Sequence, residues 1–204
     1  MYKYSKALLK YLLFKENSPK KNTEGSYSVN WNNVQPQNLR KRLKSIFLDD
    51  KVVSSIIIRC IWALDNRDGL RSEEIYAINL ENGREIGRIA NQYLDFGVIR
   101  DDTFEKKLKD ADNRNINYLL IHNHPRGLPP SISDINALLN NSNASGITIG
   151  HNGTMYYYTK PNREIDVEEL DIALKHFSMY TEATGIEKAL ELLSKRYGFV
   201  FKKL

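Results

Sequence analysis

Two histidines and an aspartate lie close together in the segment HNHPRGLPPSISD, residues 122–134. His122 and His124 follow the apolar run YLLI, and Pro125 comes directly after them. Because alternate side chains of a β-strand point to the same face, we expect both imidazoles to project together. Pro125 cannot continue a ladder of hydrogen bonds, so the strand should end there. The sequence therefore predicts two imidazoles side by side at the carboxyl end of a buried strand.

The aspartate follows a short turn. Residues 126–130 reverse the chain, and Ser131 is then a good helix N-cap, with Asp134 three residues later in a capping box that carries Asp in place of Glu. Each pattern alone has an ordinary interpretation, a polar strand end for the histidine pair and a helix cap for Ser131. Together they bring two imidazoles and a carboxylate to one point, a donor set that suits Zn²⁺ with a fourth position left to water.

The remaining histidines and the single cysteine indicate structural roles. His151 stands in a predicted hairpin turn, which favours a polar turn residue, and His176 falls in an amphipathic helix. Cys60 excludes an intramolecular disulfide and lies among aliphatic residues, so we expect a buried thiol in a protein of a reducing compartment.

The histidine and serine motifs carry a family resemblance. HNHP (122–125) followed by SISD (131–134) resembles the His-x-His-Pro and Ser-x-x-Asp signature of the JAMM (MPN/JAB) zinc metalloproteases, and its His-Asn-His-Pro form is most similar to the bacterial RadC-like branch. The resemblance covers roughly residues 70–160. One departure is the loop at 125–130, which has six residues where the family usually has seven.

The resemblance implies a metal and a reaction. Zn²⁺ would be held by His122, His124 and Asp134 and would activate water to hydrolyse an amide bond. Ser131 would donate a hydrogen bond to the developing oxyanion.

The resemblance also implies a glutamate general base at the start of the strand beside the histidines. Glu73 and Glu74 both stand before a predicted strand. Glu74 is preferred because the small residue Ala77 follows it three positions later, and Glu73 is the alternative.

The elements around the motif predict a mixed α/β (α+β) fold, a mixed sheet flanked by helices, and the resemblance implies its cytidine-deaminase-like/MPN form. Asn-Gly pairs within residues 74–90 and 146–160 mark two hairpins. Segment 52–64 could be a helix or a strand, since its β-branched content is high. The other predicted elements are a strand at 116–122 and helices at 37–48, 103–114, 131–141, 167–180 and 186–198.

We expect three regions along the chain. Residues 1–66 form a helical N-terminal extension, with a first helix ending near Glu16 and a polar linker at 17–37. Residues 67–162 form the metal-binding domain, and the helices of 163–204 pack on it.

Charge and hydropathy bear on partners and location. The net charge is +5, and several basic residues fall in the first quarter of the chain. These residues could contact nucleic acid. A solvated helix face is the favoured interpretation, because no base-stacking aromatic residues are interleaved with them. No segment is long and apolar enough for a membrane span or a signal peptide, so we expect a cytoplasmic protein. The basic residues are Lys20, Lys21, Arg40, Lys41, Arg42 and Lys44.

Three functions are compatible with these patterns. The leading hypothesis is a zinc-dependent hydrolase that cleaves a peptide or isopeptide bond in a protein or peptide substrate such as a ubiquitin-like conjugate. The second is a RadC-like protein of a mobile element or phage that acts near DNA through the basic N-terminal quarter. The third is a non-catalytic MPN scaffold that binds a protein partner, which is weakened because all three ligand types and a candidate base are present.

Overall fold

A computed structural model describes residues 27–89 and 101–204. The helix predicted to end near Glu16 therefore lies outside the described residues, as do Lys20 and Lys21. Among the described residues, no helix is both long enough and apolar enough to cross a membrane.

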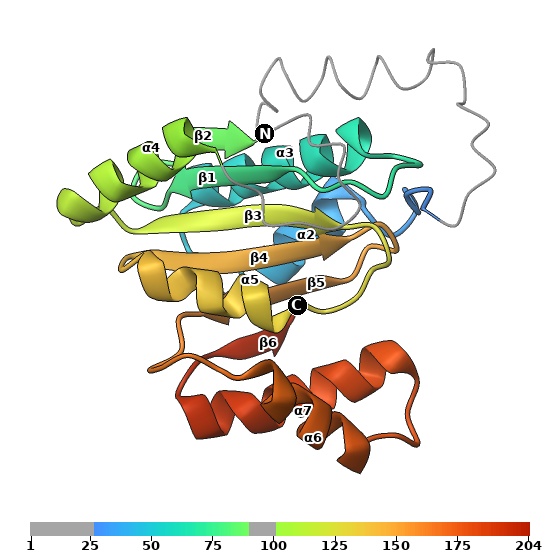
Figure 1. Ribbon diagram of the computed structural model, residues 1–204. Coiled ribbons are helices and arrows are strands. Elements are labelled where there is room, and N and C mark those ends of the chain that lie inside the picture. The colour runs from blue at the N-terminus through green and yellow to red at the C-terminus, as the bar shows by residue number, and fades with distance from the viewer. Residues whose placement is uncertain (1–26, 90–100) are drawn as a thin grey trace.

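A six-stranded mixed sheet runs through the centre of the described chain, in the order β2-β1-β3-β4-β5-β6 (Figure 1). β3 and β4 are parallel, and the other neighbouring pairs are antiparallel. This confirms the predicted mixed sheet. The strands are β1 (Ile75–Asn79), β2 (Glu85–Ile89), β3 (Tyr118–His124), β4 (Ala144–Gly150), β5 (Met155–Thr159) and β6 (Phe201–Lys203).

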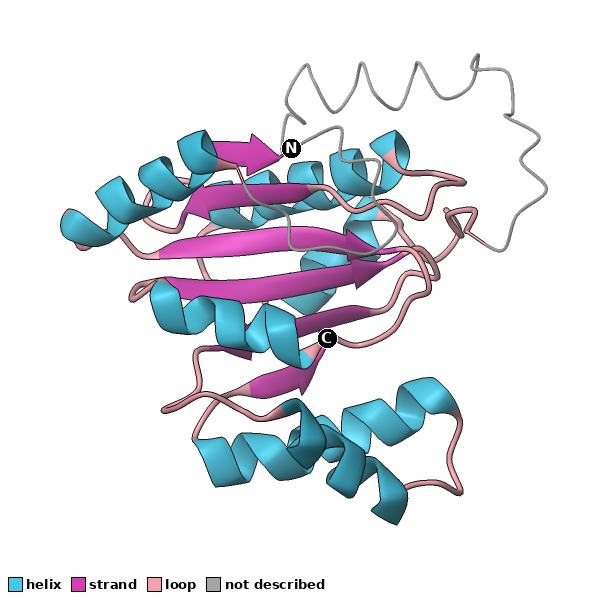
Figure 2. Cartoon of the chain, in the orientation of Figure 1, coloured by secondary structure: helices cyan, strands magenta, loops and turns pink. Residues whose placement is uncertain are grey.

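Helices cover both faces of the sheet (Figure 2). α2 (Pro36–Leu43) and α3 (Asp50–Asn66) lie behind it in this view and share one apolar core with β1, β3, β4 and β5. A second core on the opposite face joins the sheet to three other helices. These are α4 (Asp102–Asn113), α5 (Ile132–Ala137) and α7 (Glu182–Tyr197), and α6 (Val167–His176) packs against α7.

α3 resolves the ambiguity of segment 52–64 in favour of a helix. The Asp49 side chain caps its first turn by accepting hydrogen bonds from Lys51 N at 2.7 Å and Val52 N at 3.0 Å. Nine of its seventeen residues are buried, which explains the apolar character of this stretch. Strand-forming side chains thus pack as a buried helix because the capped first turn and the sheet face favour it.

Most of the other predicted elements are confirmed, with shifts at their ends. Both hairpins form, as β1–β2 and β4–β5. The helix predicted at 37–48 ends at Leu43, and the helix predicted at 131–141 ends at Ala137, followed by the 3-10 turn η1 (Leu138–Asn140). The sequence reading missed β6, which pairs with β5 and brings the end of the chain into the same sheet.

β3 divides its side chains between the two cores. Leu119 and Ile121 point into the core formed with α2 and α3, and Tyr118 points into the core on the opposite face. By the same alternation, His122 and His124 share the face of Tyr118, and Asn123 shares the face of Leu119 and Ile121.

Candidate metal and catalytic site

Strand register brings the start of β1 to the end of β3. Ile75 is paired with His122 in the antiparallel β1–β3 ladder. Continuing this register by two residues places Glu73 opposite His124, on the face that carries both histidines. The parallel strand β4 ends beside them, with Gly150 paired to His124. The site therefore forms where β3 and β4 end and β1 begins.

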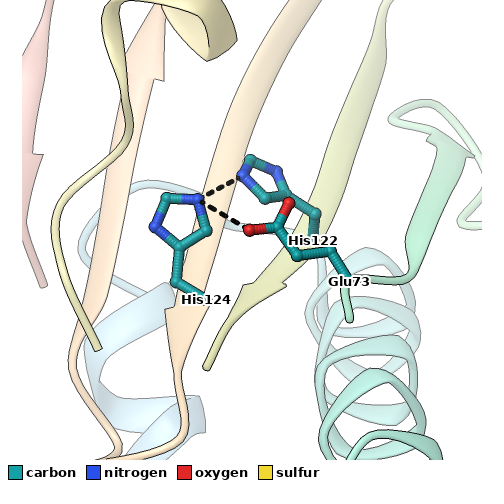
Figure 3. Close-up of side chains that lie close together, drawn as sticks. All are labelled: Glu73, His122 and His124. Atoms are coloured by element: carbon teal, nitrogen blue, oxygen red, sulfur yellow. Dashed lines mark hydrogen bonds and ion pairs between the residues drawn. The ribbon is translucent and has the colours of Figure 1, made fainter. Parts of the chain in front are cut away.

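The two imidazoles face each other, as the sequence predicts. His122 Nε2 and His124 Nε2 lie 3.0 Å apart, and a Glu73 carboxylate oxygen lies 3.7 Å from His124 Nε2 (Figure 3). Suitable ligand atoms of these three residues all lie within 4.8 Å of one another. His122 is 4 % exposed, whereas the side chains of Asp134 and Glu73 are 24 % and 34 % exposed, so the site opens to solvent on the side of the carboxylates.

Asp134 approaches the same point from α5. Its Oδ1 lies 3.6 Å from His122 Nε2, and its Oδ2 lies 3.4 Å from His124 Nε2. The six-residue loop before Ser131 therefore closes far enough to bring this carboxylate to both imidazoles. Gly127 allows the turn because its φ is +67° and because a Cβ there would lie 2.4 Å from the Asn152 side chain.

Ser131 forms the predicted capping box. Its hydroxyl accepts a hydrogen bond from Asp134 N at 3.1 Å, and Asp134 Oδ2 accepts from Ser131 N at 2.7 Å. The hydroxyl also donates to Asp134 Oδ2 at 2.8 Å. Ser131 thus orients the candidate ligand Asp134, and donation to an oxyanion would require the hydroxyl to turn away from that carboxylate.

The two glutamates before β1 point to opposite faces of the sheet. Glu73 faces the imidazoles, whereas Glu74 is 1 % exposed and lies on the α3 side. The Glu74 carboxylate accepts hydrogen bonds from Asn66 Nδ2 and the Tyr76 hydroxyl and lies 3.5 Å from Arg67 Nε. Burial, and then this hydrogen bond to Glu74, raise the pKa of Tyr76. The preference for Glu74 as the base therefore needs correction, because its carboxylate is engaged away from the histidines and Glu73 occupies the expected place.

Neighbouring groups set the orientation of the histidines. The Leu128 carbonyl lies 2.9 Å from His124 Nδ1, so that Nδ1–H donates to it and Nε2 is the nitrogen that offers a lone pair once the imidazole is neutral. Thr148 Oγ1, on β4, lies 3.4 Å from His122 Nε2. The sequence reading missed Thr148, because only the β3–β4 register, in which Thr148 is paired with His122, reveals its proximity.

Charge interactions shift the titration of the site. Burial acts to lower the pKa of His124, but hydrogen bonding and charge interaction with Asp134, together with the charge of Glu73, outweigh it and raise the pKa to about 9. Burial likewise acts to raise the pKa of Asp134, but His122 and His124 outweigh it and lower the pKa well below its ordinary value. The site therefore stabilises positive charge between the imidazoles and the carboxylates.

The other two histidines and the cysteine differ in their burial. His151 lies in the predicted turn but is buried there, and burial lowers its pKa. His176 is exposed at the end of α6. Cys60 is fully buried, as predicted, and burial raises the pKa of its thiol to about 12.

Most of the basic cluster that the structure describes is engaged within the chain. Asp50 Oδ1 lies 3.0 Å from Arg40 Nη1 and 2.9 Å from Lys44 Nζ. Arg42 donates to the Gly153 carbonyl at 2.8 Å. Contact with nucleic acid stays a prediction, and these contacts reduce the positive charge available for it.

Comparison with known proteins gave no match to this chain among protein families, curated proteins or solved structures. The inference of function therefore depends on the side chains at the site. It combines two imidazoles, the capped carboxylate of Asp134 and the further carboxylate of Glu73 at one end of the sheet.

Proposed function

We propose that this protein is a zinc-dependent hydrolase of the JAMM type, with the MPN form of the mixed sheet, that cleaves a peptide or isopeptide bond. The observation that carries the proposal is the convergence of His122 Nε2, His124 Nε2 and the Asp134 carboxylate, with Glu73 beside them. His124 is already oriented for metal binding by the Leu128 carbonyl.

The spacing of the donor atoms supports zinc. A tetrahedral ion with bonds of 2.0–2.2 Å separates neighbouring ligand atoms by about 3.3–3.6 Å. The Nε2 atoms of His122 and His124 are 3.0 Å apart, and each lies 3.4–3.6 Å from an Asp134 oxygen. The three groups could therefore close on the ion with small movements. Two imidazoles and one carboxylate also match the ligands of known catalytic zinc sites, which leave one position open.

Each side chain has a distinct part in the proposed reaction. Bound zinc would act as a Lewis acid and make a water molecule acidic near neutral pH. Glu73 accepts the proton from the attacking water and delivers it to the leaving amine. Ser131 holds the Asp134 carboxylate in place through the capping box. Glu73 also lies within 4.8 Å of both imidazoles, but we assign Asp134 as the third ligand because its oxygens are closer to them, at 3.6 Å from His122 and 3.4 Å from His124.

Metal analysis tests the site. We expect the purified full chain to bind one zinc ion, and His122→Ala and Asp134→Ala to lose it, because each removes one of three donors. Glu73→Gln should keep the ion. Zinc measured by atomic emission after equilibration and desalting gives the stoichiometry. His176→Ala is the matched control, since His176 is exposed on α6 and should not affect zinc content. A His122→Ala protein that binds as much zinc as the wild type would contradict the site.

Cleavage assays test the reaction. A panel of peptides and ubiquitin-like conjugates should include at least one substrate that the zinc-loaded wild type cleaves and that Asp134→Ala does not. A protein that binds zinc in this site yet cleaves no member would favour the non-catalytic MPN scaffold. Salt-dependent DNA binding that disappears on deletion of residues 1–45 would favour the RadC-like alternative.

Zinc affinity should depend on pH. A metal ligand must be deprotonated, and the pKa of His124 without metal is raised to about 9. Below that pH, zinc has to displace a proton, so its apparent affinity should fall about tenfold per pH unit, or about 100-fold from pH 8 to pH 6. Competition with a chelator of known proton affinity measures this slope. An affinity that stays constant over these two units would contradict the raised pKa.

A further inference from the structure

Asn123, between the two histidines, holds the segment that carries Glu73. Its side chain is fully buried on the face of β3 opposite to the imidazoles. Asn123 Oδ1 accepts a hydrogen bond from Glu74 N at 2.8 Å, and Asn123 Nδ2 donates to the Ser72 carbonyl at 3.3 Å. One amide thus binds both peptide groups that flank the Cα atom of Glu73.

His151 fixes which way this amide is turned. The Tyr27 carbonyl, an acceptor only, lies 2.6 Å from His151 Nδ1, so Nδ1 carries a proton and donates. In the neutral imidazole Nε2 must then accept, and it lies 3.0 Å from Asn123 Nδ2. The amide nitrogen therefore points at His151 and Ser72, and the amide oxygen is left for Glu74 N. All the polar groups of this buried amide have partners.

The side-chain amide of Asn123 binds the backbone just beyond the point where the β1–β3 hydrogen bonds end. The β1–β3 pairing ends at Ile75 and His122, so Glu73 lies beyond the last backbone pair. Without another restraint, this end of β1 would fray, as strand and helix ends commonly do. Asn123 continues the pairing with its side chain, and His151 also donates from its backbone N to the His124 carbonyl at 3.1 Å.

We propose that Asn123, locked by His151, is a positioning residue that holds the Glu73 carboxylate over the histidine pair. This inference rests on the proposed function, in which Glu73 moves the proton. Asn123 thus has a role different from that of the histidines on either side of it. Asn123 orients the base, whereas the Leu128 carbonyl orients His124.

The first test is independent of activity. In Asn123→Ala, amide hydrogen exchange of a peptide covering residues 72–75 should quicken at least tenfold in the metal-free protein, because the Glu74 amide loses its acceptor. Asn79→Ala is the matched control, since Asn79 is a buried asparagine at the far end of β1 that accepts from Glu81 N at 2.7 Å. Exchange of residues 72–75 that is equal in the Asn123 variant and the wild type would overturn the inference.

The second test follows catalysis. With equal zinc content, Asn123→Ala should lower kcat by about 10- to 100-fold and leave KM and zinc affinity within about threefold, whereas a general loss of structure would change all three. Asn123→Asp keeps the acceptor for Glu74 N but sets a carboxylate oxygen against two acceptors, the Ser72 carbonyl and His151 Nε2. Its kcat should therefore lie between those of Asn123→Ala and the wild type, and a kcat below the wild type is the expected result in this variant if the alanine variant does not fold. Wild-type kcat in both Asn123 variants, with Glu73→Gln inactive, would overturn this inference alone. Unchanged cleavage in Glu73→Gln would instead overturn the proposed function.

Discussion

Glu73→Gln is expected to lower the rate of substrate cleavage by about 10²- to 10⁴-fold while the protein stays folded and keeps its zinc. Glutamine has nearly the same shape as glutamate but cannot accept the proton, and general base catalysis contributes a factor of this size. The Glu73 side chain is 34 % exposed and glutamine keeps its size, so the variant should stay folded. The measurement is kcat/KM on the best substrate of the panel, at matched zinc content.

Two comparisons make this result specific to Glu73. Glu81→Gln makes the same chemical change at an exposed position beyond the other end of β1 and should leave the rate unchanged. Glu74→Gln alters the adjacent glutamate, whose carboxylate faces α3, and the rate per folded molecule should fall far less than in Glu73→Gln. If Glu74→Gln abolished cleavage and Glu73→Gln did not, the base would be Glu74 after all.

The histidine pair and Asp134 could be found from the sequence because each depends on short-range geometry. Strand alternation fixes the relation between His122 and His124, and a capping box fixes Asp134 relative to Ser131. The only long-range step was closure of one short loop. Local rules therefore sufficed for three of the residues at the site.

Strand alternation also distinguishes Glu73 from Glu74. The preference for Glu74 rests only on its distance in sequence from Ala77 and takes no account of which face of the strand each side chain occupies. Ala77 packs in the core on the side of the histidines. A residue that shares its face in the same strand must be an even number of positions away, which selects Glu73 and excludes Glu74. The alternation of side chains along β1 can be predicted from the sequence, and it favours Glu73, the alternative base.

Other features depend on contacts between distant segments and had no local signal. The contacts of Asn123 with the start of β1, and of Thr148 with His122, follow from which strands are neighbours and from their register. β6 is three residues long and becomes a strand only because β5 offers it a free edge. Segment 52–64 shows the opposite case, in which the sheet face and an N-cap override a β-branched composition.

The buried cluster around Glu74 should have the largest effect on stability. We expect Glu74→Gln to lower the free energy of unfolding by about 3–5 kcal/mol, because breaking a buried ion pair leaves a charge without compensation. Arg67 is 4 % exposed, and its Nε and Nη2 have no hydrogen-bond partner among the described residues. The Glu74 carboxylate, 3.5 Å from Nε, therefore supplies the charge that the guanidinium needs. Chemical denaturation followed by circular dichroism measures the change.

A double-mutant cycle separates the ion pair from the loss of hydrogen bonds. Arg67→Met alone leaves Glu74 with its donors Asn66 and Tyr76, so it should destabilise less than Glu74→Gln does. In the double variant, no charge is left without a partner, and the loss should be smaller than the sum of the two single losses by at least about 1 kcal/mol. Additive losses would mean that the two charges do not interact, and the cluster would then hold the start of β1 through the hydrogen bonds of Asn66 and Tyr76 alone.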